Sequence, residues 1–198
     1  EEIIRDFSLT AVSKHAAIYD LQKLTWLNSQ YMNAVPLERL LDLALPFFKA
    51  AELVGETLTP GEREYVLRVL ETVRSRARTL VELADMAFYF FRDDFTYDPK
   101  GVQKFFTAPG VPDLLRAGKE ALARVENFGL AETEAAYREL IAERGISGGT
   151  LIHPTRLALT GRTVGPGLFD IIVLLGKERC LERLEKAAAW IEENAVRK

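Results

Sequence analysis

The chain has 198 residues, of which 48% are hydrophobic and 28% are charged. This is enough apolar material for a buried core in one large or two small domains. No apolar run reaches the roughly 18 residues of a membrane-spanning helix, because even the stretch 168–175 contains Asp170. A single cysteine, Cys180, excludes an internal disulfide and favours a reducing, cytoplasmic compartment. The amino-terminal sequence lacks the regions of a signal peptide, and we expect the chain to be a fragment of a longer protein.

The charge is unevenly distributed along the chain. Its net value of −3 argues against a nucleic-acid partner, since proteins that bind phosphates usually carry a basic excess. Residues 144–169, however, contain no acidic side chain. Such clusters indicate either a polyanion-binding surface or an ordinary solvated face. The two basic clusters are Arg144, His153, Arg156 and Arg162, and Arg68, Arg74, Arg76 and Arg78.

The predicted elements are all helices. Leucines recur at helical spacing after Pro36, and Thr59-Pro60-Gly61-Glu62 has the pattern of a capping box. Thr79 is a predicted cap for a helix that runs to the aromatic cluster 88–91, and the turn 74–78 before it displays three arginines. Asp98-Pro99 is a further predicted cap. Amphipathic segments follow at 111–125, 131–144, 151–159, 166–175 and 177–193.

No convincing alternating strand pattern or fixed-period repeat is present in the sequence. We therefore predict an all-α fold of two packed helical sub-bundles with a boundary near Asp98.

The sequence offers little catalytic chemistry. Its two histidines lack acidic neighbours at metal-ligand spacing, and its glycine pairs lack the context of nucleotide-binding loops. Asp93, Asp94 and Asp98 could together hold magnesium, but Asp98 is already predicted to cap a helix. We expect no catalytic residue and no metal site in this chain.

The stretch 156–169, Arg-Leu-Ala-Leu-Thr-Gly-Arg-Thr-Val-Gly-Pro-Gly-Leu-Phe, is followed by Leu-Leu-Gly-Lys-Glu-Arg at 174–179. Together they resemble a signature near the C-terminus of bacterial-type glutamyl-tRNA synthetases, which are class I glutamate-tRNA ligases. Residues 20–31 resemble the stem-contact region of that family, and 73–80 with 93–95 resemble its first anticodon-binding subdomain. The resemblance thus covers nearly the whole chain in the family's order.

The resemblance implies a stem-contact segment at 1–35 and two anticodon-binding subdomains at 36–98 and 99–198. It implies recognition of the glutamate tRNA within a ligase that attaches glutamate using ATP. The HIGH and KMSKS motifs that bind ATP in class I synthetases do not occur in the sequence. ATP and magnesium are therefore expected in a catalytic domain outside this chain, with no cofactor in this fragment. A monomer is expected.

Carried over by position, the family pattern implies that Arg76 reads the third anticodon base and Arg156 the first, while Gly165, Pro166 and Leu168 hold the middle base. A guanidinium suits this task, because its fork of donors matches the adjacent O2 and N3 acceptors of cytosine. The family commonly has a hydroxylated residue where this chain has Gly165. Any contact made there must come from the backbone around Gly165 and Pro166.

Other cations are expected to meet tRNA phosphates and set the register. Arginine at position 76 also favours an enzyme that rejects glutamine tRNA. The family usually has glycine after Trp-Leu-Asn, where this chain has Ser29. The predicted phosphate contacts are Arg74, Arg78, Arg162, Lys14 and Lys23.

Two alternatives remain open at the level of sequence. A helical protein-protein interaction module would need no catalytic motif either. A small helical enzyme would use the aspartates at 93, 94 and 98 with magnesium.

Overall fold

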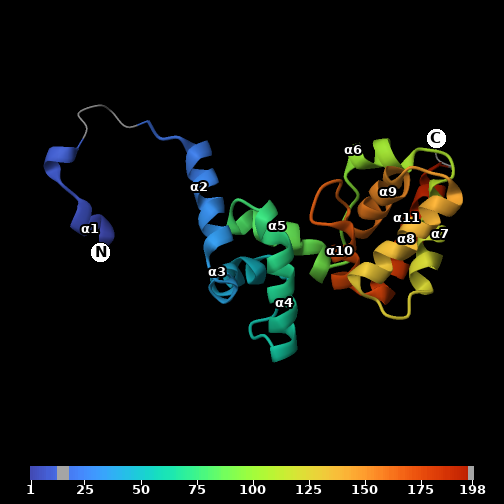
Figure 1. Cartoon of the computed structure of the whole chain (residues 1–198), viewed down its shortest axis with the longest axis horizontal. Helices are drawn as coiled ribbons and strands as arrows, with labels where there is room; N and C mark the ends of the chain where they lie inside the picture. The colour runs from blue at the N-terminus through green and yellow to red at the C-terminus, as the bar shows by residue number, and fades with distance from the viewer. Residues whose placement is uncertain (13–17, 196–198) are drawn as a thin grey trace.

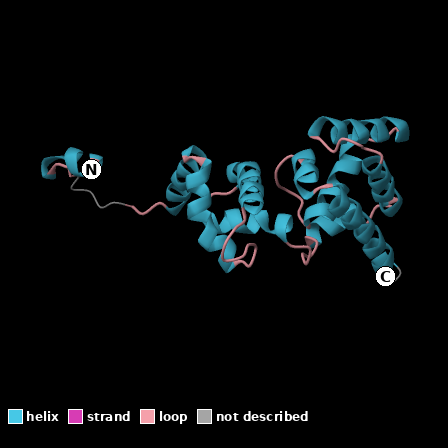
Figure 2. Ribbon diagram, turned by 90° about the horizontal axis from the view of Figure 1, so that it is seen from below, coloured by secondary structure: helices cyan, strands magenta, loops and turns pink. Residues whose placement is uncertain are grey.

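A computed structural model describes residues 1–12 and 18–195 of the chain. Within these residues all regular structure is helical, which confirms the predicted all-α class (Figure 2). No described helix is long and apolar enough to cross a membrane. The elements in chain order are α1 (Glu2–Asp6), η1 (Leu9–Ala11), α2 (Leu21–Ala34), α3 (Leu37–Ala50), α4 (Pro60–Val73), η2 (Arg74–Arg76), α5 (Leu80–Phe91), α6 (Pro99–Gly101), η3 (Val102–Phe106), α7 (Val111–Ala123), α8 (Leu130–Arg144), α9 (Gly148–Thr160), α10 (Leu168–Leu175) and α11 (Lys177–Ala195).

Helices α3, α4 and α5 pack against one another and form the first group (Figure 1). The predicted capping box opens α4, where the Thr59 side chain accepts from the Glu62 backbone and the Glu62 carboxylate accepts from the Thr59 backbone. The Thr79 side chain caps α5 in the predicted way. One stripe of each helix is buried between the three, including Leu41, Leu70 and Leu83.

Helices α7 to α11 form the second group, on the opposite side of the molecule from α2 (Figure 1). The long helix α11 packs against α7, α9 and α10. Its buried face includes Leu184 and Ala188, as the helical spacing predicted. Tyr137 of α8 is fully buried, and the ring of Phe169 at the start of α10 packs edge-on against it at 5.8 Å.

The segment after Asp98 differs from a simple amphipathic helix. The Asp98 side chain accepts from the Lys100 backbone, as expected for a cap. The resulting helix α6 is only three residues long and continues into the π-helical turn η3 before α7 begins at Val111. Gly101 is buried so closely against Leu157 and Thr163 that a Cβ there would overlap them. This contact places the short helix against the loop that follows α9.

Helix α2 lies outside both groups and presents a largely exposed apolar face. Asp20 caps it by accepting from the Lys23 backbone. The Asn28 side chain donates to the Arg78 carbonyl at 2.6 Å, which ties α2 to the turn that follows η2. Trp26 and Tyr31 are 58% and 69% exposed. The helix is therefore joined to the first group near the arginine-rich turn.

Candidate nucleic-acid interface

Arg76 lies in the short 3-10 helix η2, between α4 and α5. Val73 and Ala77, on either side of this 3-10 helix, are both buried in the core, whereas Arg76 itself is exposed. Arg74 is half-buried in the same turn. The fold thus anchors the backbone of this basic segment and leaves the Arg76 guanidinium at the surface.

Arg156 reaches the same surface from α9. Its side chain is half-buried, and its Nη1 donates to the Pro166 carbonyl at 2.6 Å. Burial lowers the pKa of Arg156, and the nearby positive charge of Arg76 lowers it further. The structure therefore brings together two arginines that the sequence places in different helical groups.

The loop between α9 and α10 contacts the Arg156 side chain. Gly165 is half-buried, while Pro166 and Leu168 are buried, and Leu168 is part of the core with 4% exposure. A Cβ at Gly165 would lie 3.5 Å from the Arg156 Nη1 atom. The Pro166 and Leu168 side chains thus anchor this loop in the core, while Val164 and Gly167 in the same loop are exposed.

Tyr89 of α5 also lies beside this loop, although no signal in the sequence pointed to it. It is 2% exposed, and its hydroxyl would lie 3.7 Å from a Cβ at Gly165. Within the described part of the chain this hydroxyl has no hydrogen-bond partner. Burial raises the pKa of Tyr89 to about 12, although the charges of Arg156 and Arg162 oppose that rise. In sequence Tyr89 belongs to an aromatic cluster, which signals only a core.

Two of the arginines that were predicted to contact phosphates form ion pairs with carboxylates. Arg162 donates from both terminal nitrogens to Asp85, at 2.8 and 2.7 Å, and this lowers the pKa of Asp85. Arg78 pairs with Glu82 at 3.1 Å. Their charges are balanced in this way, so they brace α5 and its flanking loops more than they attract phosphate.

The other predicted phosphate contacts differ in exposure. Lys23 is exposed on α2, and Arg74 is half-buried beside Arg76. Lys14 lies outside the described residues. The candidate interface therefore consists of Arg76 and Arg156 at its centre, with Arg74 and Lys23 on nearby elements.

Asp93, Asp94 and Asp98, the aspartates considered as a magnesium site, each have a partner within the protein. Asp93 pairs with Arg179 and Arg183, and Asp94 pairs with Arg92. Asp98 accepts from the backbone as a cap. Among the described residues no group of three or more potential ligands could hold a metal ion. The aspartates do not fit a magnesium site, because each already has a cationic or backbone partner.

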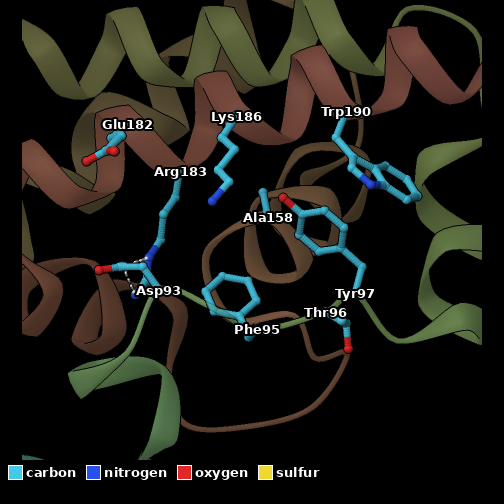
Figure 3. A pocket seen from close by; sticks show the side chains of 9 residues that line it. All are labelled: Asp93, Phe95, Thr96, Tyr97, Ala158, Glu182, Arg183, Lys186 and Trp190. Carbon is cyan, nitrogen blue, oxygen red and sulfur yellow. Dashed lines mark hydrogen bonds and ion pairs between the residues drawn. The ribbon is translucent and has the colours of Figure 1, made fainter.

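A small cavity of about 270 Å³ lies between the loop after α5 and helix α11 (Figure 3). Phe95, Tyr97 and Trp190 supply its aromatic walls, and Arg183 lies over the Phe95 ring at 4.9 Å. Ala158 of α9 also lines this cavity. The cavity is next to the Asp93–Arg183 ion pair, which Figure 3 shows at its edge.

Cys180 is fully buried, and burial raises the pKa of its thiol to about 12. A thiol in this environment stays protonated at neutral pH and is a poor nucleophile. This agrees with the absence of any redox or nucleophilic motif around it in the sequence.

Comparison with known proteins identifies relatives of this chain. A family model described as an anticodon binding domain matches residues 39–188. The chain is 57% identical to the glutamate–tRNA ligase of Desulforudis audaxviator (strain MP104C) and 50% identical to that of Moorella thermoacetica (strain ATCC 39073 / JCM 9320). Each match covers 98% of this chain but only 39% and 40% of the relative, so the chain spans about two fifths of these proteins.

Solved structures of glutamate-tRNA ligases have a similar fold over this region. The crystal structure of a glutamate tRNA ligase from Elizabethkingia meningosepticum, in complex with its amino acid, matches with a TM-score of 0.78 and 27% identity. The match covers 95% of this chain and 36% of that chain. The glutamate-tRNA synthetase of Elizabethkingia anophelis matches with a TM-score of 0.74. The match over residues 39–188, together with the helical fold, shows that this chain belongs to the anticodon-binding domain family.

Proposed function

We propose that this chain recognises the anticodon of a glutamate tRNA as one part of a glutamate–tRNA ligase. The observation that supports the proposal is that the exposed Arg76 lies near enough to the half-buried Arg156 for its charge to lower the pKa of Arg156. Two neighbouring positive charges repel each other, and a polyanion bound against them would remove that repulsion. Unpaired anticodon bases expose their Watson–Crick edges, where proteins obtain sequence specificity on RNA.

The two arginines have different tasks in this proposal. Arg76 reads the third anticodon base from its exposed turn, and Arg156 reads the first base from α9. The middle base lies against the backbone at Gly165, with Pro166 and Leu168 supporting that backbone from within the core. This arrangement suits cytosine at the first and third positions, since a guanidinium donates to both O2 and N3 of that base.

Affinity for the tRNA backbone comes from cations that can reach phosphates. Among the described residues, Arg74 and Lys23 form no ion pair and are candidates for phosphate contacts. Lys14, which lies outside the described residues, is a further candidate from the resemblance alone. Arg78 and Arg162 contribute less, because Glu82 and Asp85 already balance their charges.

Activation of glutamate belongs to the remaining part of the ligase. The resemblance implies that ATP and magnesium bind in that catalytic part, and no acidic cluster in the described residues fits the metal. A cytoplasmic location and a monomeric state fit this role, as does the reduced, buried Cys180.

Titration of labelled anticodon stem-loops tests the assignment of Arg76. The loops differ only in the third anticodon base, cytosine or guanine, and fluorescence anisotropy measures their Kd at two salt concentrations. The wild-type chain should prefer cytosine by about 1–3 kcal/mol, which is the discrimination typical of one bidentate base contact. Arg76→Ala should bind both loops with nearly equal affinity.

Arg138→Ala is the matched control for this experiment, because Arg138 is an exposed arginine on α8 that pairs with Glu134. It removes the same charge and should keep the preference for cytosine. Equal preferences in Arg76→Ala and the wild type would contradict the assignment. Failure of the wild type to bind either loop would contradict the proposed function itself.

The alternative of a protein-interaction module has one feature in its favour, the exposed apolar face of α2. Leu21, Leu24 and Trp26 are 64%, 46% and 58% exposed there. Such a face is typical of a surface that contacts protein. Salt-insensitive binding of a protein partner, together with no affinity for the stem-loops, would favour this second function.

A further inference from the structure

The Tyr89 hydroxyl is an unusual group in this interface. It is buried, and within residues 1–12 and 18–195 it neither donates nor accepts a hydrogen bond. Most buried hydroxyls are paired, because a missing hydrogen bond leaves the desolvation of the group uncompensated. A group of this kind at a binding surface requires an explanation from function or from a conformational change.

Its surroundings identify the partner that it lacks. A Cβ at Gly165 would lie 3.7 Å from the Tyr89 Oη and 3.5 Å from the Arg156 Nη1, with no other described neighbour within 4 Å. The hydroxyl and the guanidinium thus both border the space beside Gly165. Because a guanidinium has only donors, the Tyr89 oxygen can serve it as an acceptor.

Arg156 is held in the present arrangement by a bond that RNA binding would disturb. Within the described residues its side chain makes one hydrogen bond, from Nη1 to the Pro166 carbonyl, and its charge is near that of Arg76. A guanidinium has five N–H donors, so most of those on Arg156 are free of protein acceptors in the described structure. Turning toward a base edge removes the guanidinium from Pro166 and leaves it without an internal anchor.

We propose that Tyr89 is a positioning residue for Arg156, whose guanidinium donates to the Tyr89 hydroxyl when it turns from the Pro166 carbonyl to an RNA base. The inference rests on the proposed function, since it assigns Arg156 to a base. Glycine at position 165 suits this arrangement, because a larger side chain there would occupy space that both groups border. Orientation by a fixed acceptor reduces the freedom of the guanidinium, and this sharpens discrimination between bases.

The test compares Tyr89→Phe with the wild-type chain, using anticodon stem-loops that carry cytosine or guanine at the first anticodon base. The measured quantity is the ratio of the two Kd values, which does not depend on the fraction of folded protein. The ratio should fall about tenfold in Tyr89→Phe, as expected for one hydrogen bond to a charged group. Thermal unfolding of Tyr89→Phe should occur at the wild-type Tm or above it, because the lost oxygen has no partner in the free protein.

Tyr65→Phe is the matched control, since the Tyr65 hydroxyl donates to the Phe90 carbonyl at 3.1 Å. Losing that bond should lower the Tm and leave the Kd ratio unchanged. The two variants therefore separate positioning from stability. Tyr89→Phe should lower the discrimination without lowering the Tm, and Tyr65→Phe should lower the Tm without changing the discrimination.

The double variant Tyr89→Phe/Arg156→Ala shows whether Tyr89 acts through Arg156. Its Kd ratio should equal that of Arg156→Ala alone, whereas a further loss would overturn the positioning role. A wild-type Kd ratio in Tyr89→Phe, with Arg156→Ala impaired, would overturn this inference and leave the proposed function intact. No binding by the wild type would overturn both.

Discussion

The buried Arg183 of α11 donates hydrogen bonds to several elements of the fold. It is only 4% exposed, and its Nη2 donates to the Tyr89 and Arg92 carbonyls at 2.7 and 2.9 Å. Its Nη1 donates to the Leu159 carbonyl. Burial lowers the pKa of Arg183, and the hydrogen bond to Asp93 opposes that shift by compensating the buried charge. One arginine thus closes the end of α5 and fixes it to α9.

The Asp93 carboxylate should make the stability of the protein sensitive to acid. Burial alone would raise the pKa of Asp93, but hydrogen bonds from Arg183 and Arg179 outweigh it and lower that pKa. A lowered folded-state pKa stabilises the fold above the unfolded pKa of about 4, and this contribution disappears as the pH falls through the folded value. Asp93→Asn should therefore lower the free energy of unfolding near neutral pH and flatten its decline in acid.

Urea unfolding at about pH 7 and about pH 3 measures this difference. Asp42→Asn, on the exposed side of α3, corrects for the loss of one negative charge. If Asp93→Asn and the wild type lose stability in parallel between the two pH values, the ion pair does not control the acid response.

At the scale of elements, the ends of α5 and α9 set the positions of the segments that carry Arg76 and Gly165. Thr79 starts α5 directly after the arginine turn, and Gly161 ends α9 four residues before Gly165. The Gly161 carbonyl also accepts from the Asp98 backbone at 2.8 Å. A left-handed glycine there both stops the helix and brings the loop after α5 against it.

Gly161 and Gly145 form a natural pair for testing this role. Both end helices in the left-handed region, with φ of 73° and 61°. A Cβ at Gly145 meets nothing within 4 Å, whereas at Gly161 it would lie 2.5 Å from the Thr96 carbonyl oxygen and 2.8 Å from the Phe95 ring. Gly145→Ala should cost about 1–2 kcal/mol in unfolding free energy, the strain of left-handed backbone alone.

Gly161→Ala should cost about 1–3 kcal/mol more than Gly145→Ala, because the close contact with the loop is added to that strain. Chemical denaturation of the two variants gives both numbers under the same conditions. Equal losses would mean that the loop 95–96 adjusts without cost and does not hold the end of α9.

At the scale of the whole molecule, the two helical groups share one core. Helix α10 contacts α4, and both Arg179 and Arg183 of α11 donate to carbonyls at the end of α5. Arg76 is attached to the first group and Arg156 to the second, so the interface exists only while the groups stay together. The boundary near Asp98 stays a prediction, since these contacts cross it.

We expect the two groups to unfold in one cooperative transition. The chain has two tryptophans, and Trp26→Phe leaves Trp190 of α11 as the only one. In this variant, urea transitions followed by Trp190 fluorescence and by helical circular dichroism should coincide. Separate midpoints would show that the first group unfolds independently and that the interface can come apart before the core does.

Much of the helical architecture was predictable because its signals are local. The caps at Thr59, Thr79 and Asp98 act over two to three residues, and the apolar stripes repeat within one helix. Each such signal is complete within a few neighbouring residues. The resemblance around residues 156–179 likewise indicated the family, which the match over 39–188 confirmed.

The sequence by itself thus determined the helices, their caps and the family, together with the arginines to be considered. Only the tertiary structure decided that Arg76 lies near Arg156, that Asp85 pairs with Arg162, and that the Leu168 side chain lies in the core. It also placed the Tyr89 hydroxyl beside Gly165. These relations join residues far apart in the chain, and they depend on how helices cross and pack, which no periodicity within a single helix encodes.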